Sequence, residues 1–370
     1  MRILFIVPSL KCGGLERVAS VLSNVWAHED SVSLTLVALD SKKPFYKLDR
    51  SITVIQASAN VDDGPSLWKA LKKWYWLRRL VDRTSPSIVL SFGERYNAFI
   101  IGCLAGLRSS SGSYIPICVG NRTAPQTSLV GLRGLINPIA YRRTALVFVQ
   151  TERAREMLRT RYQNVRMVVV PNPIPDPLAS SEAHIDYRQK VIVNVGSFTG
   201  HKNQAALIRI FASLQAEFPD WRLVFAGAGP REEEARALAN AVGLENRIAF
   251  LGNVEDIAQV HLKGSIFAFT SLLEGYPNAL AEAMRSGLAS VAFDCDTGPA
   301  DMITHGETGF LVKLNADLDF AAQLRHLMAD ESLRKHVGTN ARRQMSHLDP
   351  LEVARRYLTS LRCSASTLPG

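Results

Sequence analysis

Short hydrophobic runs alternate with longer amphipathic segments along the whole chain. The runs are three to eight residues long, the length of a buried strand, and the segments between them carry apolar residues at helical spacing. This alternation predicts an α/β protein whose parallel sheets are covered by helices. The predicted strands are residues 3–8, 32–39, 52–56, 88–92, 115–119, 145–149, 168–170, 191–195, 222–226, 248–250, 266–270 and 288–293. The main predicted helices are residues 18–26, 66–83, 97–107, 152–162, 205–218, 232–242, 257–262 and 279–285.

A proline-rich stretch interrupts this pattern near the middle of the chain. The sequence PNPIPDP at 171–177 has four prolines in seven residues, and the alternation restarts after it. A length of 370 residues also suits two domains. We therefore predict a first domain over 1–170, a linker over 171–187, a second domain over 188–345, and a C-terminal helix over 346–370 that packs back on the first domain.

Composition narrows the class of protein. With 47% hydrophobic and 21% charged residues, the chain can bury full-sized cores. The apolar run at 3–7 faintly mimics a signal peptide but is too short and is better explained as a strand. No apolar stretch approaches the roughly 20 residues that span a bilayer, which predicts a soluble or peripheral protein. Scattered cysteines without CxxC spacing predict a reduced, cytoplasmic protein with no disulfide framework and no cysteine metal site. The five cysteines are Cys12, Cys103, Cys118, Cys295 and Cys363.

The positive charge is concentrated in the N-terminal half. Residues 1–170 hold 24 Lys and Arg against 11 Asp and Glu, whereas residues 171–370 hold 19 against 23. A basic half predicts an anionic partner on that side, such as a phospholipid, a phosphorylated lipid or a nucleic acid.

The segment 66–83 is the most distinctive helix of this basic half. Its apolar stripe predicts a buried face made of Leu67, Leu71, Trp74, Leu77 and Val81. A second, basic stripe with a tryptophan in its middle is typical of an interfacial helix on anionic lipid headgroups. That stripe consists of Lys69, Lys72, Lys73, Trp76, Arg79 and Arg83. The alternative is a salt-bridged surface helix, although the segment has few acids for such pairs.

In the second half, the sequence SLLEGYPNALAEAMRSG at 271–287 predicts a tight loop followed by a helix that stops at Gly287. The loop follows a buried strand, and ligands of open α/β sheets bind at the carboxyl ends of strands, where helix N-termini favour phosphate. Glu274 lies in the loop and Glu282 about two turns into the helix, so both carboxylates can face one ligand. The alternative is a solvated helix with two surface glutamates.

Further glycine-containing loops follow other strands, at 196–202, 227–230 and 294–301. Lys202 in the first of them is suited to neutralising phosphate, and the GAG turn of the second lets backbone approach a ligand closely. After the first strand, Gly13-Gly14 also permits close approach, although it is not the GxGxxG fingerprint and can equally form a simple turn.

Together these segments resemble the retaining nucleotide-sugar glycosyltransferases of family 4, and the resemblance covers nearly the whole chain. It resembles most the bacterial members that extend lipid-linked glycans. The resemblance implies the GT-B architecture, in which two Rossmann-like domains with parallel sheets face each other across a cleft. The first domain is then on the acceptor side and the second binds the nucleotide sugar. The matching segments are GGLERV (13–18), GSFTGHKNQ (196–204), FAGAGP (225–230), LGNVEDI (251–257), SLLEGYPNALAEAMRSGL (271–288) and GPADMITHGETGFLV (298–312).

The resemblance also implies a metal-independent reaction without a cofactor, in which a UDP-sugar is the substrate. Glu274, which binds the donor sugar, and Lys202, which holds phosphate, are then the catalytic pair. Glu282 accepts hydrogen bonds from the ribose, and the leaving phosphate takes the acceptor's proton, so no nucleophilic carboxylate is needed. The implied donor-binding residues are Gly14, Ser197, His201, Gly227, Asn253, Val254, Gly275, Tyr276, Pro277, Asn278, Ala279 and Glu282.

The sequence departs from the family at two points. Ser197 stands where the family usually has an arginine, and His201 or an arginine elsewhere is the candidate replacement. Many members have an acceptor-side histidine, and the run GNRTAP at 120–125 has Arg122 near that region instead. Arg122 either meets an anionic acceptor group or pairs locally.

We therefore predict a retaining hexosyltransferase bound peripherally to the inner face of the cytoplasmic membrane. It moves a hexose or N-acetylhexosamine from a UDP-sugar to a polyprenyl-diphosphate-linked saccharide for polysaccharide, O-antigen or glycoprotein glycan assembly. One alternative is a soluble GT-B transferase or epimerase with a small acceptor. Another is a nucleic-acid-binding protein, but the basic residues form no such motif and the glycine loops would be unexplained.

Overall fold

The computed structural model describes residues 1–11, 13–40, 43–58, 66–109, 112–128, 130–178 and 184–366. Cys12 and the side chain of Leu67 lie outside the described part. The chain forms two compact units, Met1–Pro173 with Pro350–Gly370, and Ile174–Asp349. The first three residues of the segment expected to be a linker thus belong to the first unit, and the others belong to the second. Ile174 is buried in the second unit, where its N–H donates to the carbonyl of Leu348 at 2.8 Å.

The first unit is built on a parallel sheet of seven strands in the order β3-β2-β1-β4-β5-β6-β7. The strands are β1 (Arg2–Val7), β2 (Ser33–Ala38), β3 (Thr53–Gln56), β4 (Ile88–Phe92), β5 (Ile117–Gly120), β6 (Leu146–Val149) and β7 (Met167–Val169). In the register, Ile3 pairs with Leu34 on one side and with Ile88 on the other. The central strands are buried on both faces because helices cover both sides of the sheet.

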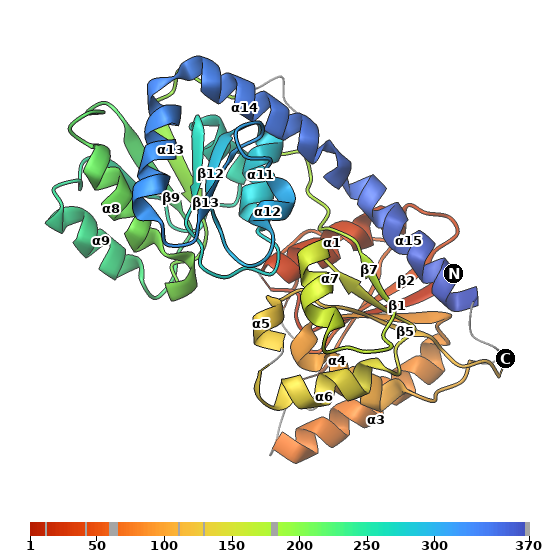
Figure 1. Cartoon of the computed structure of the whole chain (residues 1–370). Helices are drawn as coiled ribbons and strands as arrows, with labels where there is room; N and C mark the ends of the chain where they lie inside the picture. Colours follow the sequence, from red (N-terminus) through yellow and green to blue (C-terminus); the bar gives the residue numbers. More distant parts are fainter. Residues whose placement is uncertain are drawn as a thin grey trace. The chain divides into compact units, whose positions relative to one another are not determined.

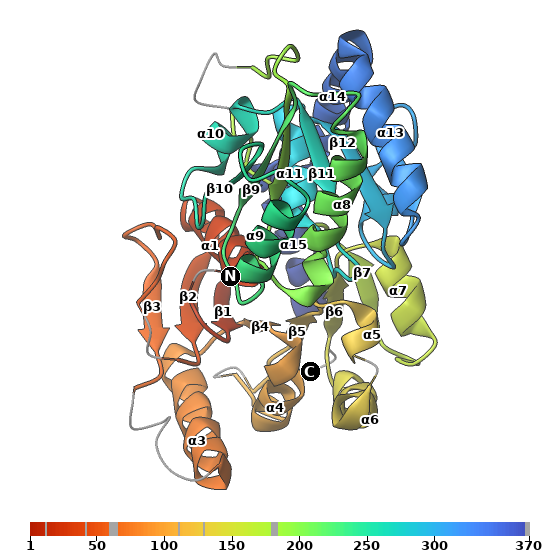
Figure 2. The same cartoon turned by 90° about the vertical axis from the view of Figure 1, so that its left-hand side faces the viewer.

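On one face of this sheet lie α1 (Gly14–Ala27) and the C-terminal helix α15 (Pro350–Ser366), which contact each other. The indole N–H of Trp26 donates to the carbonyl of Ala354 at 3.1 Å. On the other face lie α3 (Ser66–Thr84), α4 (Glu94–Leu104) and α6 (Gly131–Tyr141), as Figure 1 shows. Figure 2 shows that α4 lies between the other two, both of which it contacts. The short α5 (Pro125–Ser128) and α7 (Glu152–Arg159) complete this unit.

The second unit has a parallel sheet of six strands in the order β10-β9-β8-β11-β12-β13. Its strands are β8 (Val191–Val195), β9 (Arg222–Ala226), β10 (Ile248–Phe250), β11 (Ile266–Phe269), β12 (Ala289–Asp294) and β13 (Phe310–Lys313). Both sheets therefore follow the doubly wound Rossmann order, which reverses direction between β1 and β4 and between β8 and β11. The helical segments are η1 (Gly200–Lys202), α8 (Gln204–Leu214), α9 (Glu232–Ala241), α10 (Ile257–Leu262), α11 (Asn278–Ser286), α12 (Pro299–Met302), α13 (Asp317–Ala329), α14 (Glu331–Gln344) and η2 (Met345–Leu348).

The predicted α/β class with two parallel sheets is confirmed, and each predicted strand has a counterpart. The elements that were missed include one strand and one helix of 11 residues. The edge strand β13 (Phe310–Lys313) overlaps the end of the segment 306–312, whose glycines and polar residues hide a short strand. The helix α6 has two glycines and an internal Pro138, which all disfavour helix, so the packing of buried residues such as Tyr141 has to stabilise it.

The predicted orientation of α3 is partly wrong. Leu77 and Val81 are buried as expected, but Leu71 is 49% exposed and Trp74 is 41% exposed. Trp76, predicted on the outer face, is half-buried and packs against the hydrophobic core. The helix is thus rotated about its axis, because apolar side chains occur on two adjacent stripes and the packing on the sheet chooses between them.

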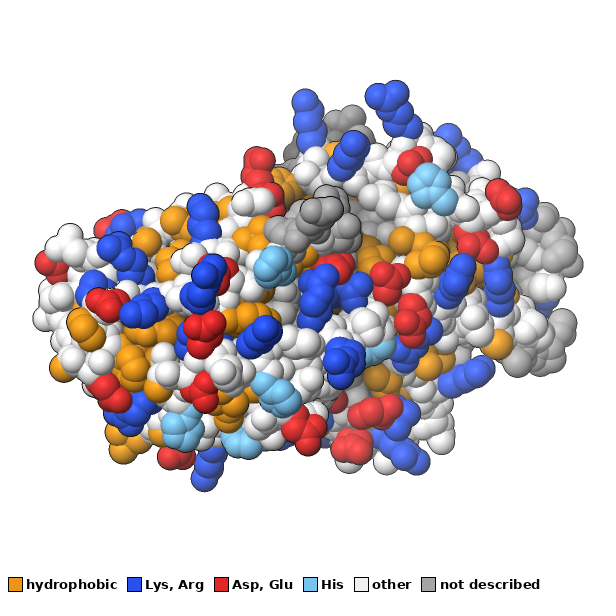
Figure 3. Space-filling view, turned by 90° about the horizontal axis from the view of Figure 1, so that it is seen from above, with side chains coloured by type: hydrophobic (Ala, Val, Ile, Leu, Met, Phe, Trp, Pro, Cys, Tyr) orange, Lys and Arg blue, Asp and Glu red, His pale blue; other side chains and the backbone are white. Residues whose placement is uncertain are grey.

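No described helix is both long enough and apolar enough to cross a bilayer. On the face drawn in Figure 3, Lys and Arg side chains are interspersed with Asp and Glu, so this face carries no broad patch of one sign. The charge asymmetry of the sequence therefore does not appear as a single basic patch on this face.

Candidate active site

Two loops meet where the strand order of the second sheet reverses. One follows β8 and the other follows β11, which is β8's neighbour although β9 and β10 intervene in the sequence. The N–H of Leu272 donates to the carbonyl of His201 at 2.7 Å, and the Thr270 hydroxyl donates to the carbonyl of Asn203 at 3.1 Å. These bonds hold the two loops side by side at the carboxyl end of the sheet, where open α/β sheets bind ligands.

The predicted catalytic residues meet across these two loops. Lys202 Nζ lies 2.5 Å from Glu274 Oε1, and the two side chains are only 20% and 11% exposed. An ion pair shielded from water in this way is stronger than a surface pair. Lys202 can neutralise a phosphate, and the second oxygen of Glu274 can accept a hydrogen bond from a ligand hydroxyl.

The glycines after β8 and β9 allow these loops to pack backbone against backbone. Gly227 has φ +138°, and a Cβ there would lie 2.2 Å from the carbonyl oxygen of Gly196. A Cβ on Gly229 would lie 2.5 Å from the carbonyl oxygen of Phe198. The Gly227 N–H also donates to the carbonyl of Gly252 at 2.7 Å. Only glycine fits at positions 227 and 229, so the GAG turn has a packing role besides any contact with a ligand.

The loop after β12 packs against the Glu274 loop. The Thr297 hydroxyl donates to the carbonyl of Glu274. A Cβ on Gly298, which has φ +106°, would lie 2.2 Å from Cδ of Pro277, the N-cap of α11. The N–H of Asn278 donates to the carbonyl of Tyr276 at 3.0 Å. The Ala281 N–H donates to the carbonyl of Pro277 at 3.1 Å. The amides for a phosphate at this helix N-terminus are therefore those of Ala279 and Leu280.

Glu282 is not a surface residue. It lies in the second turn of α11 and is only 4% exposed, while the Ser286 hydroxyl donates to its backbone carbonyl at 2.9 Å. Burying a carboxylate costs free energy unless polar groups contact it. A glutamate at this buried position is therefore expected to make polar contacts rather than to face solvent. The surface-glutamate alternative is wrong for this residue.

The other predicted donor residues differ in exposure. Ser197, His201 and Asn253 are exposed, and Tyr276 and Pro277 are buried. The half-buried ones are Gly227, Val254, Gly275, Asn278 and Ala279. Gly14 belongs to the first unit, where it is the first residue of α1. The site described here consists of residues of the second unit.

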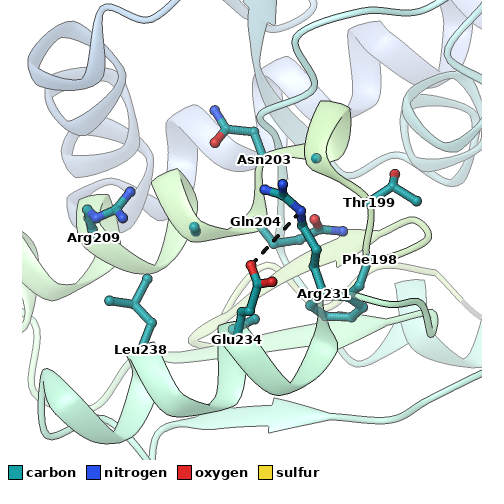
Figure 4. A pocket seen from close by; sticks show the side chains of 11 residues that line it. Phe198, Thr199, Asn203, Gln204, Arg209, Arg231, Glu234 and Leu238 are labelled. Atoms are coloured by element: carbon teal, nitrogen blue, oxygen red, sulfur yellow. Dashed lines mark ion pairs between the residues drawn. The ribbon is translucent and has the colours of Figure 1, made fainter.

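A small cavity of about 190 Å³ lies on the outer side of the Lys202 loop, between α8 and α9. Figure 4 shows Arg231 between Asn203 and Glu234, with which it forms an exposed ion pair at 3.9 Å. The Arg231 guanidinium carbon would lie 3.4 Å from a Cβ on Gly200. Arg231 thus brings an arginine to the loop in which Ser197 replaces one, while His201 contacts only the Thr199 hydroxyl at 3.4 Å among its described side-chain contacts.

Arg122 pairs locally. Its guanidinium donates to the Tyr357 hydroxyl at 3.0 Å and to the side-chain oxygen of Asn172, and it stacks 4.2 Å above the Phe92 ring. These partners hold the guanidinium in place within the first unit, and a contact with an acceptor stays a prediction.

A buried polar group beside the reversal point of the first sheet was missed from the sequence. Glu94, the first residue of α4, is 2% exposed, and the Thr123 hydroxyl donates to it. Gly93 precedes it with φ +114°, where a Cβ would lie 2.4 Å from the Pro8 ring. Burial and Glu94 raise the pKa of Tyr141 well above its usual range. The available signal was an acid directly after a buried strand, but the predicted helix began three residues too late.

The cysteines of the described part are free thiols, and Cys295 lies close to the site. Burial, followed by the charges of Glu274 and Asp294, raises the pKa of Cys295 to about 12. The neutral thiol is therefore favoured, and at pH 7.5 Cys295 should hold roughly a thousandfold less reactive thiolate than an ordinary cysteine. We expect maleimide to label the exposed Cys363 first and Cys295 only after unfolding, as read by peptide mass spectrometry. Rapid labelling of Cys295 in the folded protein would contradict this burial.

No described group of three or more His, Cys, Asp or Glu side chains is arranged to hold a metal ion. Metal independence stays a prediction, which is tested by measuring turnover in the presence of EDTA.

Comparison with known proteins agrees with the geometry. The family model described as "Glycosyl transferases group 1" matches residues 179–344. The amylovoran biosynthesis glycosyltransferase AmsD of Erwinia amylovora is 26% identical over 93% of this chain and 95% of its own length. A Campylobacter jejuni alpha-1,4-N-acetyl-D-galactosaminyltransferase, named for a diNAcBac-PP-undecaprenol-linked substrate, is 20% identical over 97% of both chains.

Among solved structures, Anabaena Alr3699/HepE in complex with UDP and glucose superposes with a TM-score of 0.79. It is 18% identical and covers 98% of this chain and all of its own, so the likeness shows a shared fold. Taken with the two Rossmann-like units and the shielded Lys202–Glu274 pair, these similarities support a glycosyltransferase of the GT-B fold.

Proposed function

We propose that the protein is a retaining, metal-independent family 4 enzyme that transfers a hexose or N-acetylhexosamine from a UDP-sugar to a lipid-linked saccharide. The bond between the sugar C1 and the diphosphate oxygen breaks, and a bond between C1 and an acceptor oxygen forms on the same face. The acceptor hydroxyl's proton passes to the leaving diphosphate. No metal ion and no separate cofactor takes part.

The observation that carries this proposal is the Lys202–Glu274 pair between β8 and β11. Negative charge grows on the leaving diphosphate as the sugar departs, and a fixed lysine beside a helix N-terminus stabilises that charge. Glu274 accepts from the sugar hydroxyls and keeps Lys202 in position before the donor binds. Glu282, which is buried in the second turn of α11, accepts hydrogen bonds from the ribose hydroxyls.

UDP is the proposed nucleotide because the solved HepE structure of the same fold holds UDP and glucose. The lipid-linked acceptor is proposed from the undecaprenyl-diphosphate substrate in the name of the Campylobacter relative. The basic first half and the cations of α3 support an anionic membrane surface as the partner. We therefore propose that the enzyme binds peripherally to the inner face of the cytoplasmic membrane. Polysaccharide, O-antigen or glycoprotein glycan assembly is the corresponding process.

A donor panel tests the proposal. UDP-glucose, UDP-galactose, UDP-N-acetylglucosamine and UDP-N-acetylgalactosamine are offered with GDP- and dTDP-sugars as controls, in EDTA, with a polyprenyl-diphosphate-linked saccharide. We expect UDP release from at least one UDP-sugar and an equatorial anomeric proton in the product by NMR, as in the α-linked donor. An inverted product would refute retention, and loss of turnover in EDTA would refute metal independence.

The acceptor is tested in the same assay. Replacing the lipid-linked saccharide with the free saccharide should lower turnover. Equal turnover with both would favour the soluble alternative, and turnover with GDP- or dTDP-sugars alone would refute the UDP assignment.

A further inference from the structure

A second cavity, of about 460 Å³, lies in the first unit against the edge of its sheet. One wall is Ile55 of β3, the terminal strand of the sheet, and the rest is α3. The lining residues are Ile55, Lys72, Tyr75, Trp76, Arg79, Leu80 and Arg83. This cavity belongs to a different unit from the Lys202–Glu274 pair.

The lining combines cations with aromatic and aliphatic side chains. Three of its members are the cations Lys72, Arg79 and Arg83. None of its lining residues in the described part of the chain is an acid, and Asp82 of α3 is not among them. The Arg79 guanidinium carbon lies 5.0 Å from the centroid of the Tyr75 ring. Arginine binds phosphate through several donors at once while its plane rests on an aromatic ring.

The apolar part of the lining indicates what the phosphate is attached to. Ile55 and the half-buried Trp76 pack against the hydrophobic core that contains Leu80. A free phosphate ion gains nothing from these groups, whereas a phosphate on a hydrocarbon chain does. Tryptophan and tyrosine beside cations are the side chains that proteins place at the level of lipid headgroups.

Apolar side chains are also exposed elsewhere on the helix layer to which α3 belongs. Trp68, Leu71 and Tyr75 of α3 are exposed, and so are Leu135 and Ile139 of α6. Both helices flank α4 in one layer of the first unit, as Figure 2 shows. The sequence 124–151, which contains α6, has no Asp or Glu. Large exposed apolar groups without acids fit the acyl region of an anionic bilayer.

We propose that this cavity binds the phosphate group of a membrane lipid. Arg79, Arg83 and Lys72 hold the phosphate, Tyr75 and Trp76 lie at the headgroup, and the hydrocarbon leaves along the exposed apolar side of α3. The proposal deepens the membrane contact of the proposed function and rests on it for its biological setting. The predicted membrane contact was a whole basic stripe of α3, whereas the present proposal assigns one cavity and one kind of ligand, a lipid phosphate.

Calorimetric titration of the full chain tests the site. The probes are dihexanoyl phosphatidylglycerol below its micelle concentration, farnesyl diphosphate, and inorganic phosphate. We expect one of the two lipid phosphates to bind at least tenfold more tightly than inorganic phosphate. Preference for the first assigns a bilayer phospholipid, and preference for the second assigns an isoprenyl diphosphate. Binding no tighter than that of inorganic phosphate, or no binding, overturns the proposal.

Matched variants separate the site from general charge attraction. Arg79→Gln with Arg83→Gln removes two exposed cations from the cavity, and Arg142→Gln with Arg143→Gln removes two exposed cations after α6. We expect the first pair to weaken the preferred lipid phosphate at least tenfold and the second to change it less than twofold. Equal weakening by both pairs overturns the site. Trp76→Phe, which keeps an apolar ring, should reduce the ligand-induced change in tryptophan fluorescence, leaving only the part that comes from the exposed Trp68 and Trp74 of the same helix.

Titration of UDP into the same wild-type sample keeps the two proposals distinguishable. Lipid phosphate binding without UDP binding would leave this site standing and reject the proposed function. UDP binding without lipid phosphate binding would reject this site and leave the proposed function standing.

Discussion

Lys202→Ala is expected to lower kcat/KM for the UDP-sugar about 10²- to 10³-fold, the usual effect of removing one group that stabilises charge in a transition state. The loss should fall mainly on kcat, because the charge on the diphosphate grows as the sugar departs. Removal of the lysine also leaves Glu274, which is only 11% exposed, without its cation.

Lys190→Ala is the matched control. Lys190 is another cation of the second unit, but its side chain is 54% exposed and pairs with the exposed Asp220. We expect its kcat/KM to stay within about twofold of the wild type, since exposed pairs contribute little. Lys190→Ala should unfold at a temperature close to that of the wild type. Lys202→Ala should unfold at a lower temperature, because the shielded Glu274 loses its cation, so kcat/KM is measured well below both unfolding temperatures. A Lys202→Ala enzyme with unchanged kcat/KM would remove this residue from the reaction.

Gly227→Ala should lower the free energy of unfolding by about 3 kcal/mol or more, through backbone strain and overpacking. The φ of +138° is unfavourable for alanine, and the new methyl group would lie 2.2 Å from the Gly196 carbonyl oxygen. Backbone cannot move aside as a flexible side chain can. The loops after β8 and β9 must separate, so UDP affinity should fall as well.

Gly243→Ala isolates the steric part of this effect. Gly243 also has a positive φ, of +68°, but no heavy atom lies within 4 Å of its Cβ position. We expect that variant to lose only about 1 kcal/mol. Urea unfolding of both variants gives the comparison. Equal losses would mean that the close approach to Gly196 does not constrain the loop.

The sequence predicted the strands well because their signal is local. Each is a short apolar run bounded by glycine, proline or polar residues, and helices over both faces make these runs continuous. β13 and α6 escaped detection for the same reason: the glycines near Phe310 and Pro138 within α6 contradict the local rules that tertiary packing overrides.

The site required more than local patterns. Lys202 and Glu274 are 72 residues apart, and they meet only because β8 and β11 are neighbours in the sheet. Periodicity does not specify strand order, so only the family resemblance assigned both residues to one site, and their ion pair was not predicted. The rotation of α3 was unpredictable for a related reason, since Leu71 and Trp76 both suit a buried stripe and only contact with the sheet decides between them.

Hydrogen–deuterium exchange with and without UDP tests the central claim most directly. If the nucleotide diphosphate binds at the loops that follow β8 and β11, UDP should slow amide exchange in the loops at 196–203, 227–230 and 274–280. Exchange at the far end of the same sheet, such as the segment 217–221 before β9, should not change. Unchanged exchange in all three loops at saturating UDP, or protection confined to other segments, would contradict the account.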